Sequence, residues 1–102
     1  MGPKRLELKN WLKRTGIEIR ELKKEFKDSQ RARGGGGDYY IMSELYHKSY
    51  EYRHRHIAYS ELRGKTRDQI EKPKENNLPN EKAIEKIKKD YFDEPTALCA
   101  GA

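Results

Sequence analysis

The stretch Asp38–Gly64, DYYIMSELYHKSYEYRHRHIAYSELRG, sets the architecture predicted for this chain. Asp38 is a favourable N-cap, Gly64 is a favourable residue just beyond a helix end, and no proline lies between them. The sequence therefore predicts one helix over 39–63, about 38 Å long at 1.5 Å per residue. Apolar and aromatic side chains lie on most sides of this helix, so it should be central and contact several other elements.

Two shorter helices are predicted after the central one. The capping box Thr66–Gln69 (TRDQ) starts a helix over 67–72, and Pro73 ends it. Asn80 caps a last helix over 81–92. Residues 93–102 are predicted to form a flexible tail.

A run of four glycines, 34–37, precedes the central helix. Such a run holds neither helix nor strand, so it separates a basic helical unit over 1–33 from a helical unit over 38–92. The run is either natural low complexity or an engineered linker. Within the first unit, Pro3 suits a first helical position, and the capping box Thr15–Glu18 predicts a break between helices over 4–14 and 17–31.

The prediction is an all-α fold, a small helical bundle of about five helices around one long central helix. The chain has 102 residues, of which 33% are apolar and 39% are charged. So few apolar residues build only a small core, so the folded state is expected to be marginally stable. A bound partner would increase that stability. The residues predicted to be mostly buried are Ile41, Leu45, Tyr52, His56, Tyr59, Leu62, Ile70, Ile84 and Ile87.

Composition and spacing exclude several classes of site. No apolar run approaches the roughly 18 residues of a membrane span, so no membrane partner is expected. One cysteine, Cys99, excludes a disulfide framework and fits a reducing intracellular location, cytoplasmic or nuclear. His54 and His56 point to opposite sides of a helix, and His47 lies about 10 Å from His54 along it, so no metal site is expected. His56 is expected to be a hydrogen-bonded core residue.

Catalytic motifs are absent from the sequence. It contains no nucleophile–base grouping, no phosphate-binding glycine motif and no H-E-x-x-H motif. The protein is therefore predicted not to be an enzyme and to need no cofactor.

The positive charge is concentrated in the first third of the chain. The net charge is +6, and residues 1–33 carry the whole excess, with 11 Lys and Arg against five Asp and Glu. Such asymmetry points to a polyanionic partner, most often a nucleic acid, and the alternatives are a solvated basic face and another acidic partner.

The helix predicted over 17–31 sorts its side chains by face. Ile19, Leu22 and Phe26 form an apolar seam at helical spacing. A second side is acidic and consists of Glu18, Glu21, Glu25 and Asp28. A third side is basic, within about 60° around the axis, and consists of Arg20, Lys24, Lys27 and Arg31, with Lys23 beside it. A line of cations at i, i+4, i+7 and i+11 is predicted to contact phosphates.

The central helix interleaves aromatic and basic side chains. It holds six of the seven tyrosines, together with Arg53 and Arg55. Such a surface stacks bases and contacts phosphates. The simpler interpretation, which we favour, is that tyrosines fill a wide, half-hydrated helix interface. Arg53 and Arg55 remain candidate ligands at the edges of that packing.

The segments LRGKTRDQIE (62–71) and NEKAIEKI (80–87) resemble the helix-turn-helix DNA-binding superfamily over residues 57–92. In that family a glycine-containing turn precedes a short capped helix, which packs on a recognition helix. The stretch TGIEIRELKKEF (15–26) is similar to a fragment of the same motif. The resemblance implies DNA binding, with a second set of contacts from Lys65, Arg67 and Lys82.

Two functional hypotheses follow. The first is a small basic nucleic-acid-binding protein, with DNA favoured over RNA, in an accessory or regulatory role such as that of a viral factor. The alternative is a non-catalytic structural or adaptor subunit that docks on protein, or on a second copy, through its tyrosine-rich helix.

Overall fold

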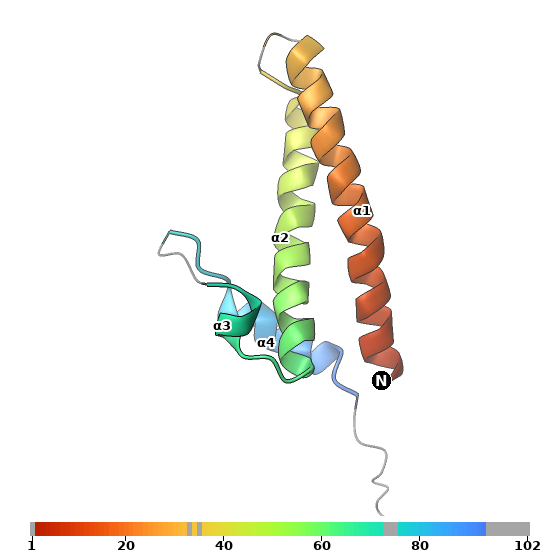
Figure 1. Ribbon diagram of the computed structural model, residues 1–102, viewed down its shortest axis with the longest axis vertical. Coiled ribbons are helices and arrows are strands. Elements are labelled where there is room, and N and C mark those ends of the chain that lie inside the picture. The colour runs from red at the N-terminus through yellow and green to blue at the C-terminus, as the bar shows by residue number, and fades with distance from the viewer. Residues whose placement is uncertain (1, 33, 35, 73–75, 94–102) are drawn as a thin grey trace, which may run out of the picture.

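The structure is a computed structural model that describes residues 2–32, 34, 36–72 and 76–93. These residues form four helices and no strand, so the predicted all-α class is confirmed. The helices are α1 (Pro3–Ala32), α2 (Tyr39–Leu62), α3 (Arg67–Ile70) and α4 (Glu81–Asp90). Figure 1 shows α1 and α2 as a long antiparallel hairpin, with α3 and α4 against the lower half of α2.

The predicted break at Thr15 is wrong, because α1 is one helix of 30 residues. Thr15 is buried inside it, so its hydroxyl is not at a helix start. An added Cβ on Gly16 would lie 3.6 Å from the Tyr52 ring of α2, which shows how closely the two helices approach there. The chain therefore has four described helices where five were expected, and the 15–26 segment contains no turn.

The remaining caps agree with the sequence. Asp38 accepts hydrogen bonds from the amides of Tyr40 and Ile41, and Asn80 accepts one from that of Ala83. Thr66 and Gln69 form the reciprocal capping box that starts α3. Three helices end earlier than predicted, α2 at residue 62, α3 at residue 70 and α4 at residue 90.

A Schellman motif ends α2. Gly64 has a φ of 92°, and its amide donates to the carbonyl of Glu61. The Lys65 amide donates to the carbonyl of Ser60. Glycine adopts this left-handed backbone conformation without steric strain, and Gly64 thereby turns the chain toward α3.

We call residues 2–15 and 50–93 the base, where α3 and α4 cover the hairpin, and residues 16–49 the arm. Two buried clusters hold the base together. Leu8 and Leu12 of α1 pack against Tyr59 of α2, and on the other side of α2 Ile57 and Ala58 pack against Ile84 of α4. Tyr52, Ile70 and Ile87 are partly buried around these clusters.

The structure corrects the prediction that His56 is the core histidine. His54 is buried, with 2% of its surface exposed, whereas His56 is exposed and stacks on Tyr52. α2 contacts α1 on one side and α4 on the opposite side. His54 lies on the side that faces α4, whereas His56 falls between the two contacts.

Burial of the other predicted core residues is mixed. Tyr59 and Ile84 are buried as predicted, whereas the rest are partly buried, namely Ile41, Leu45, Tyr52, Leu62, Ile70 and Ile87. Five buried residues are absent from the list of predicted core residues, although Leu22 belongs to the predicted apolar seam: Leu8, Leu12, Leu22, Ile57 and Ala58.

The arm consists of two helices without a third layer (Figure 1). Leu22 is its one buried side chain among the described residues. The tip is closed by Ser29, whose hydroxyl accepts from the Asp38 amide and donates to the Phe26 carbonyl. Gly37 adopts a φ of 76° beside the Phe26 ring.

The predicted flexible tail over 93–102 lies outside the described residues except for Asp93. The Asp93 carboxylate accepts from the amides of Lys4 and Arg5, at 2.9 and 3.0 Å. Amides in the first turn of a helix have no backbone acceptor within that helix. Asp93 supplies the acceptors here and so caps the start of α1. No helix in the described part of the chain is long and apolar enough to cross a membrane.

Candidate nucleic-acid interface

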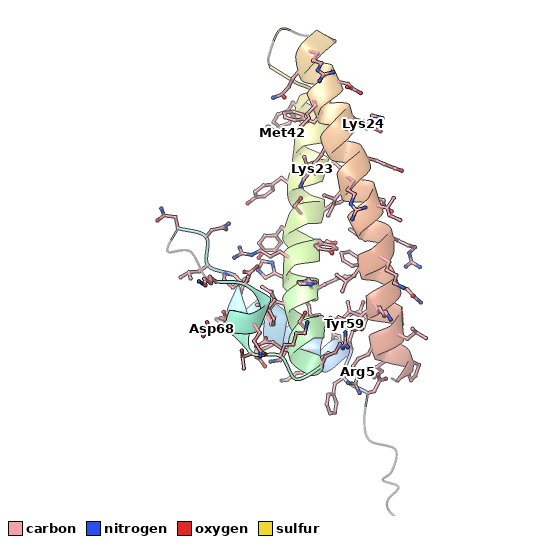
Figure 2. All side chains as sticks on the ribbon, in the orientation of Figure 1. Arg5, Lys23, Lys24, Met42, Tyr59 and Asp68 are labelled. Atoms are coloured by element: carbon pink, nitrogen blue, oxygen red, sulfur yellow. The ribbon has the colours of Figure 1, made fainter. Side chains whose placement is uncertain are left out.

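The basic side chains predicted to contact phosphates are all exposed on α1. They are Arg20, Lys23, Lys24, Lys27 and Arg31. Across residues 2–32, 34, 36–72 and 76–93, no carboxylate lies within ion-pair distance of any of them. Figure 2 shows Lys23 on the side of α1 toward α2 and Lys24 on the outer side.

The continuity of α1 lengthens this line of cations. Lys9 and Lys13 lie within about 20° of the line, at i−11 and i−7 from Arg20. Lys13 is exposed and Lys9 is half-exposed. The predicted helix break hid them, because two separate helices have no common face. We call the following set the cationic row: Lys9, Lys13, Arg20, Lys24, Lys27 and Arg31.

The cationic row is long and dense. From Lys9 to Arg31 it extends about 33 Å at 1.5 Å per residue. Like charges at i, i+4, such as Arg20 with Lys24, disfavour an isolated helix by a few tenths of a kcal/mol each. The row is therefore an uncompensated positive surface in the free protein.

The acidic side of α1 lies on the other flank of the helix, and one of its members, Glu18, reaches α2. Glu18 forms an ion pair with Lys48 of α2, and Glu44 lies 3.9 Å from the same ammonium. Hydrogen bonding to Glu18 raises the pKa of Lys48 above its ordinary value, against partial desolvation. A groove on this flank is lined by residues of both charges from the two helices: Trp11, Arg14, Thr15, Glu18, Glu44, His47, Lys48 and Glu51. One flank of the hairpin is thus acidic and mixed, and the other is basic.

The Arg53 side chain forms hydrogen bonds within the protein. Its guanidinium donates to the Glu71 carboxylate, at 2.8 and 3.1 Å, and to the side chain and backbone carbonyl of Asn77. These bonds hold the α3–α4 connection against α2. The sequence could not show this, because both partners lie 18 or more residues away.

Arg55 is also an internal contact. Its guanidinium lies 4.2 Å from the centre of the Trp11 ring on α1 and 5.9 Å from that of Tyr91. Cation–π contacts of this kind are attractive. Arg55 therefore joins α1, α2 and the end of α4.

Of the second set of candidates, Arg67 is paired and two lysines are exposed. Arg67 makes a bidentate pair with Glu81, at 2.7 and 2.8 Å, and a third bond to Glu61 at 3.2 Å. The hydrogen bonds that Arg67 donates to Glu81 raise the pKa of Arg67 and lower that of Glu81. Lys65 and Lys82 are exposed and have no ion-pair partner in the described part of the chain.

The tyrosines of α2 divide between base and arm. Tyr52 and Tyr59 pack between the helices, as the simpler interpretation expects. The other four are exposed: Tyr39 by 69%, Tyr40 by 82% and Tyr46 by 68% in the arm, and Tyr50 by 44% at the start of the base, where its ring lies 4.2 Å from that of His54. Packing within this chain therefore does not account for the aromatic side chains of the arm.

Among the described residues, no group of three or more His, Cys, Asp or Glu side chains is arranged to hold a metal ion. Comparison with protein-family models, curated proteins and solved structures gives no significant match to this chain.

Proposed function

We propose that this protein binds nucleic acid through phosphate contacts along the cationic row of α1. One observation carries the proposal. Arg53, Arg55 and Arg67 are used in internal contacts, whereas every cation of the row is free of acidic partners in the described part of the chain.

A polyanion explains what internal packing does not. Phosphates placed along the row would relieve the repulsion between its members and release condensed counterions, which supplies affinity that depends on salt. The acidic flank of the hairpin would be repelled and would orient the molecule. Lys65 and Lys82 are available for additional contacts from the base.

The proposal does not depend on the helix-turn-helix resemblance of residues 57–92. On α4, lysines alternate with acids, as Lys82 with Glu81 and Glu85, so this helix has no comparable excess charge. The preference for DNA over RNA remains a prediction from the resemblance. The same binding assay tests it when both nucleic acids are used as probes.

The test is a pair of charge reversals in α1. Lys24→Glu with Lys27→Glu should weaken binding and flatten the plot of log K against log salt by about 0.9 per lost phosphate contact on duplex DNA. Glutamate forms helix nearly as well as lysine, so α1 should stay folded, which circular dichroism would check.

Two controls make the test specific. Lys86→Glu with Lys89→Glu changes the net charge by the same amount on α4, and it should weaken binding much less. Glu21→Lys with Glu25→Lys, on the acidic side of α1, should leave affinity unchanged or slightly stronger. If the α1 and α4 reversals weaken binding equally, net charge rather than the row is responsible. If the wild-type protein binds no nucleic acid at low salt, the adaptor hypothesis takes precedence.

A further inference from the structure

The first half of α2 is nearly free of charge on the side that points away from α1. Between residues 39 and 50 only Glu44 and Lys48 are charged, although 39% of the whole chain is charged. Both lie toward α1, where Lys48 forms an ion pair with Glu18 of that helix and lies 3.9 Å from Glu44. The other side of α2 therefore presents an uncharged surface over this stretch.

Four side chains follow this uncharged surface at i, i+4, i+7 and i+11, and we call them the outer row: Tyr39, Ser43, Tyr46 and Tyr50. They lie about 130–170° around α2 from the line that faces α1, which passes through Tyr52 and Tyr59. The three rings of the row are exposed, and so is Met42 beside it. Alternating intervals of four and three residues are the spacing with which one helix packs along another.

The outer row continues an interface that the fold already uses. Ile57 lies seven residues beyond Tyr50, within about 20° of it around α2, and is buried against Ile84 of α4. At the boundary, the Asn80 side chain donates a hydrogen bond to the Tyr50 hydroxyl at 3.5 Å. Among the described residues, Figure 1 shows no helix other than α1 against the upper half of α2. The same side of α2 is thus packed against a helix in the base and uncovered in the arm.

We infer that the arm pairs with the arm of a second copy of this chain, through the outer rows of two antiparallel α2 helices. This inference goes beyond the proposed function and does not depend on it. In a two-fold dimer the same surface of both copies meets, so a charged surface would meet its own charge. The outer row avoids this repulsion because no charged residue lies on its side of α2 between residues 39 and 50.

The cationic row stays outside such an interface. It lies on α1, about 130° around that helix from the side chains that pack toward α2, such as Leu8 and Leu22. The two arms would meet through α2 alone, so both cationic rows would remain available to phosphates. Nucleic-acid binding and pairing of the arms therefore use different surfaces.

One antiparallel register matches the outer row to itself. When Tyr39 lies opposite Tyr50 of the partner subunit, Ser43 lies opposite the partner's Tyr46. A small side chain then faces each central ring and leaves room for it. In this register residue 54 of the partner subunit, where its contact with α4 begins, lies beyond the start of this α2. The α4 helix of neither copy therefore lies between the two arms.

The size of the surface indicates a weak dimer. With roughly 200 Å² for each large side chain, the exposed parts of the three rings and of Met42 amount to about 400–500 Å² in each copy. Two copies would bury about 800–1,000 Å², which is near the lower limit for a specific interface. We therefore expect a Kd on the order of 10–100 μM. The net charge of +6 on each copy opposes association, so added salt should strengthen the dimer.

Sedimentation velocity of the full chain tests the inference, at protein concentrations from about 5 to 500 μM and at low and high salt. A reducing agent keeps Cys99 from linking two copies. Tyr46→Glu places a carboxylate at the centre of the outer row, where the two copies of the charge repel each other. Tyr40→Glu is the matched control, because Tyr40 is at least as exposed and lies about 90° around α2 from the row. Glutamate forms helix better than tyrosine, so both variants should fold, which circular dichroism would check.

The wild type should shift from monomer to dimer as its concentration rises, and more so at high salt. Tyr46→Glu should raise the Kd at least tenfold, and Tyr40→Glu should change it by less than about threefold. A 1:1 mixture of Tyr46→Glu and Ser43→Lys should recover dimer, because the register places the new ammonium opposite the new carboxylate. A wild type that stays monomeric at the highest concentration would overturn the inference, and so would equal losses in the two glutamate variants.

The same experiment keeps the two proposals separate. Lys24→Glu with Lys27→Glu should lose nucleic-acid binding but dimerise as the wild type does or slightly more tightly, because it reduces the positive charge of each copy. Dimers without nucleic-acid binding would overturn the proposed function alone. Nucleic-acid binding by a strictly monomeric wild type would overturn pairing of the arms alone.

Discussion

The base and the arm of the hairpin differ in what their sequences contribute. In the base, α2 is packed between α1 and α4, and two buried clusters form on its opposite sides. In the arm, two helices meet along one seam, with Leu22 buried. Stability is therefore concentrated in the base, whereas the surface of the arm carries unpaired cations and exposed rings. We therefore expect substitutions on the surface of the arm to affect stability less than substitutions in the base.

The largest expected effect contrasts the two cores. Ile84 is fully buried in the base, so Ile84→Ala should lower the free energy of unfolding by about 2–5 kcal/mol. Leu45→Ala, at a half-buried position in the arm, should cost less than about 2 kcal/mol because less apolar surface is lost. Urea unfolding followed by circular dichroism measures both. Equal losses would show that arm and base are equally packed.

The second effect concerns the histidine in the base. The Asn80 amide donates to Nε2 of His54, so Nδ1 carries the proton and donates to the Tyr50 carbonyl, each at 2.8 Å. His54→Ala leaves both backbone groups without this partner in a buried site and should cost about 1–3 kcal/mol. His56→Ala, an exposed position, should change stability by less than about 0.5 kcal/mol. If His56→Ala lowered the unfolding midpoint more than His54→Ala, the result would support the core role that the sequence predicted for His56.

Capping boxes show what the sequence could and could not predict. Thr15–Glu18 and Thr66–Gln69 match the same pattern, yet only the second starts a helix. Before Thr66, Gly64 ends α2, so a new start is required. Around Thr15, the buried positions Leu8, Leu12, Thr15 and Leu22 follow one another at intervals of three, four or seven residues. This unbroken helical periodicity was the signal that outweighed the local box.

The candidate site was predictable to the extent that it is local. Arg20, Lys24, Lys27 and Arg31 are ordered by helix geometry alone, and the structure places them on one exposed side of α1. Lys9 and Lys13 were missed through the predicted break at Thr15. For Arg53 and Arg67, the acidic partners come from distant segments, 18 and 14 residues away, and sequence spacing does not show such pairs.

Alanine substitutions at two glycines of the arm should change the stability of the protein in opposite directions. Gly16 lies inside α1 with ordinary space for a Cβ, so Gly16→Ala should stabilise the protein by about 0.5–1 kcal/mol. Gly37 has a φ of 76°, and an added Cβ would lie 2.5 Å from the Phe26 ring. Gly37→Ala should therefore destabilise the tip of the arm by about 1–2 kcal/mol or more. Thermal unfolding of both variants measures the difference, and a destabilising Gly16→Ala would contradict a continuous α1.

The smallest expected effect depends on pH and separates the two ends of α1. Partial desolvation opposes ionisation of Asp93, but hydrogen bonds from the Arg5 and Lys4 amides outweigh it and hold the pKa of Asp93 below its ordinary 3.8. A lowered pKa in the folded state means that ionised Asp93 stabilises the fold above about pH 4, and that this contribution is lost as pH falls through the folded-state pKa. Asp93→Asn should therefore be less stable than the wild type at pH 6, and the difference should shrink as the pH is lowered toward 2. Asp28→Asn, at an exposed position in the arm, should show no such convergence. Urea midpoints at pH 2, 3, 4 and 6 would measure both series. A constant gap for Asp93→Asn would mean that the carboxylate's charge does not hold the start of α1 in the base.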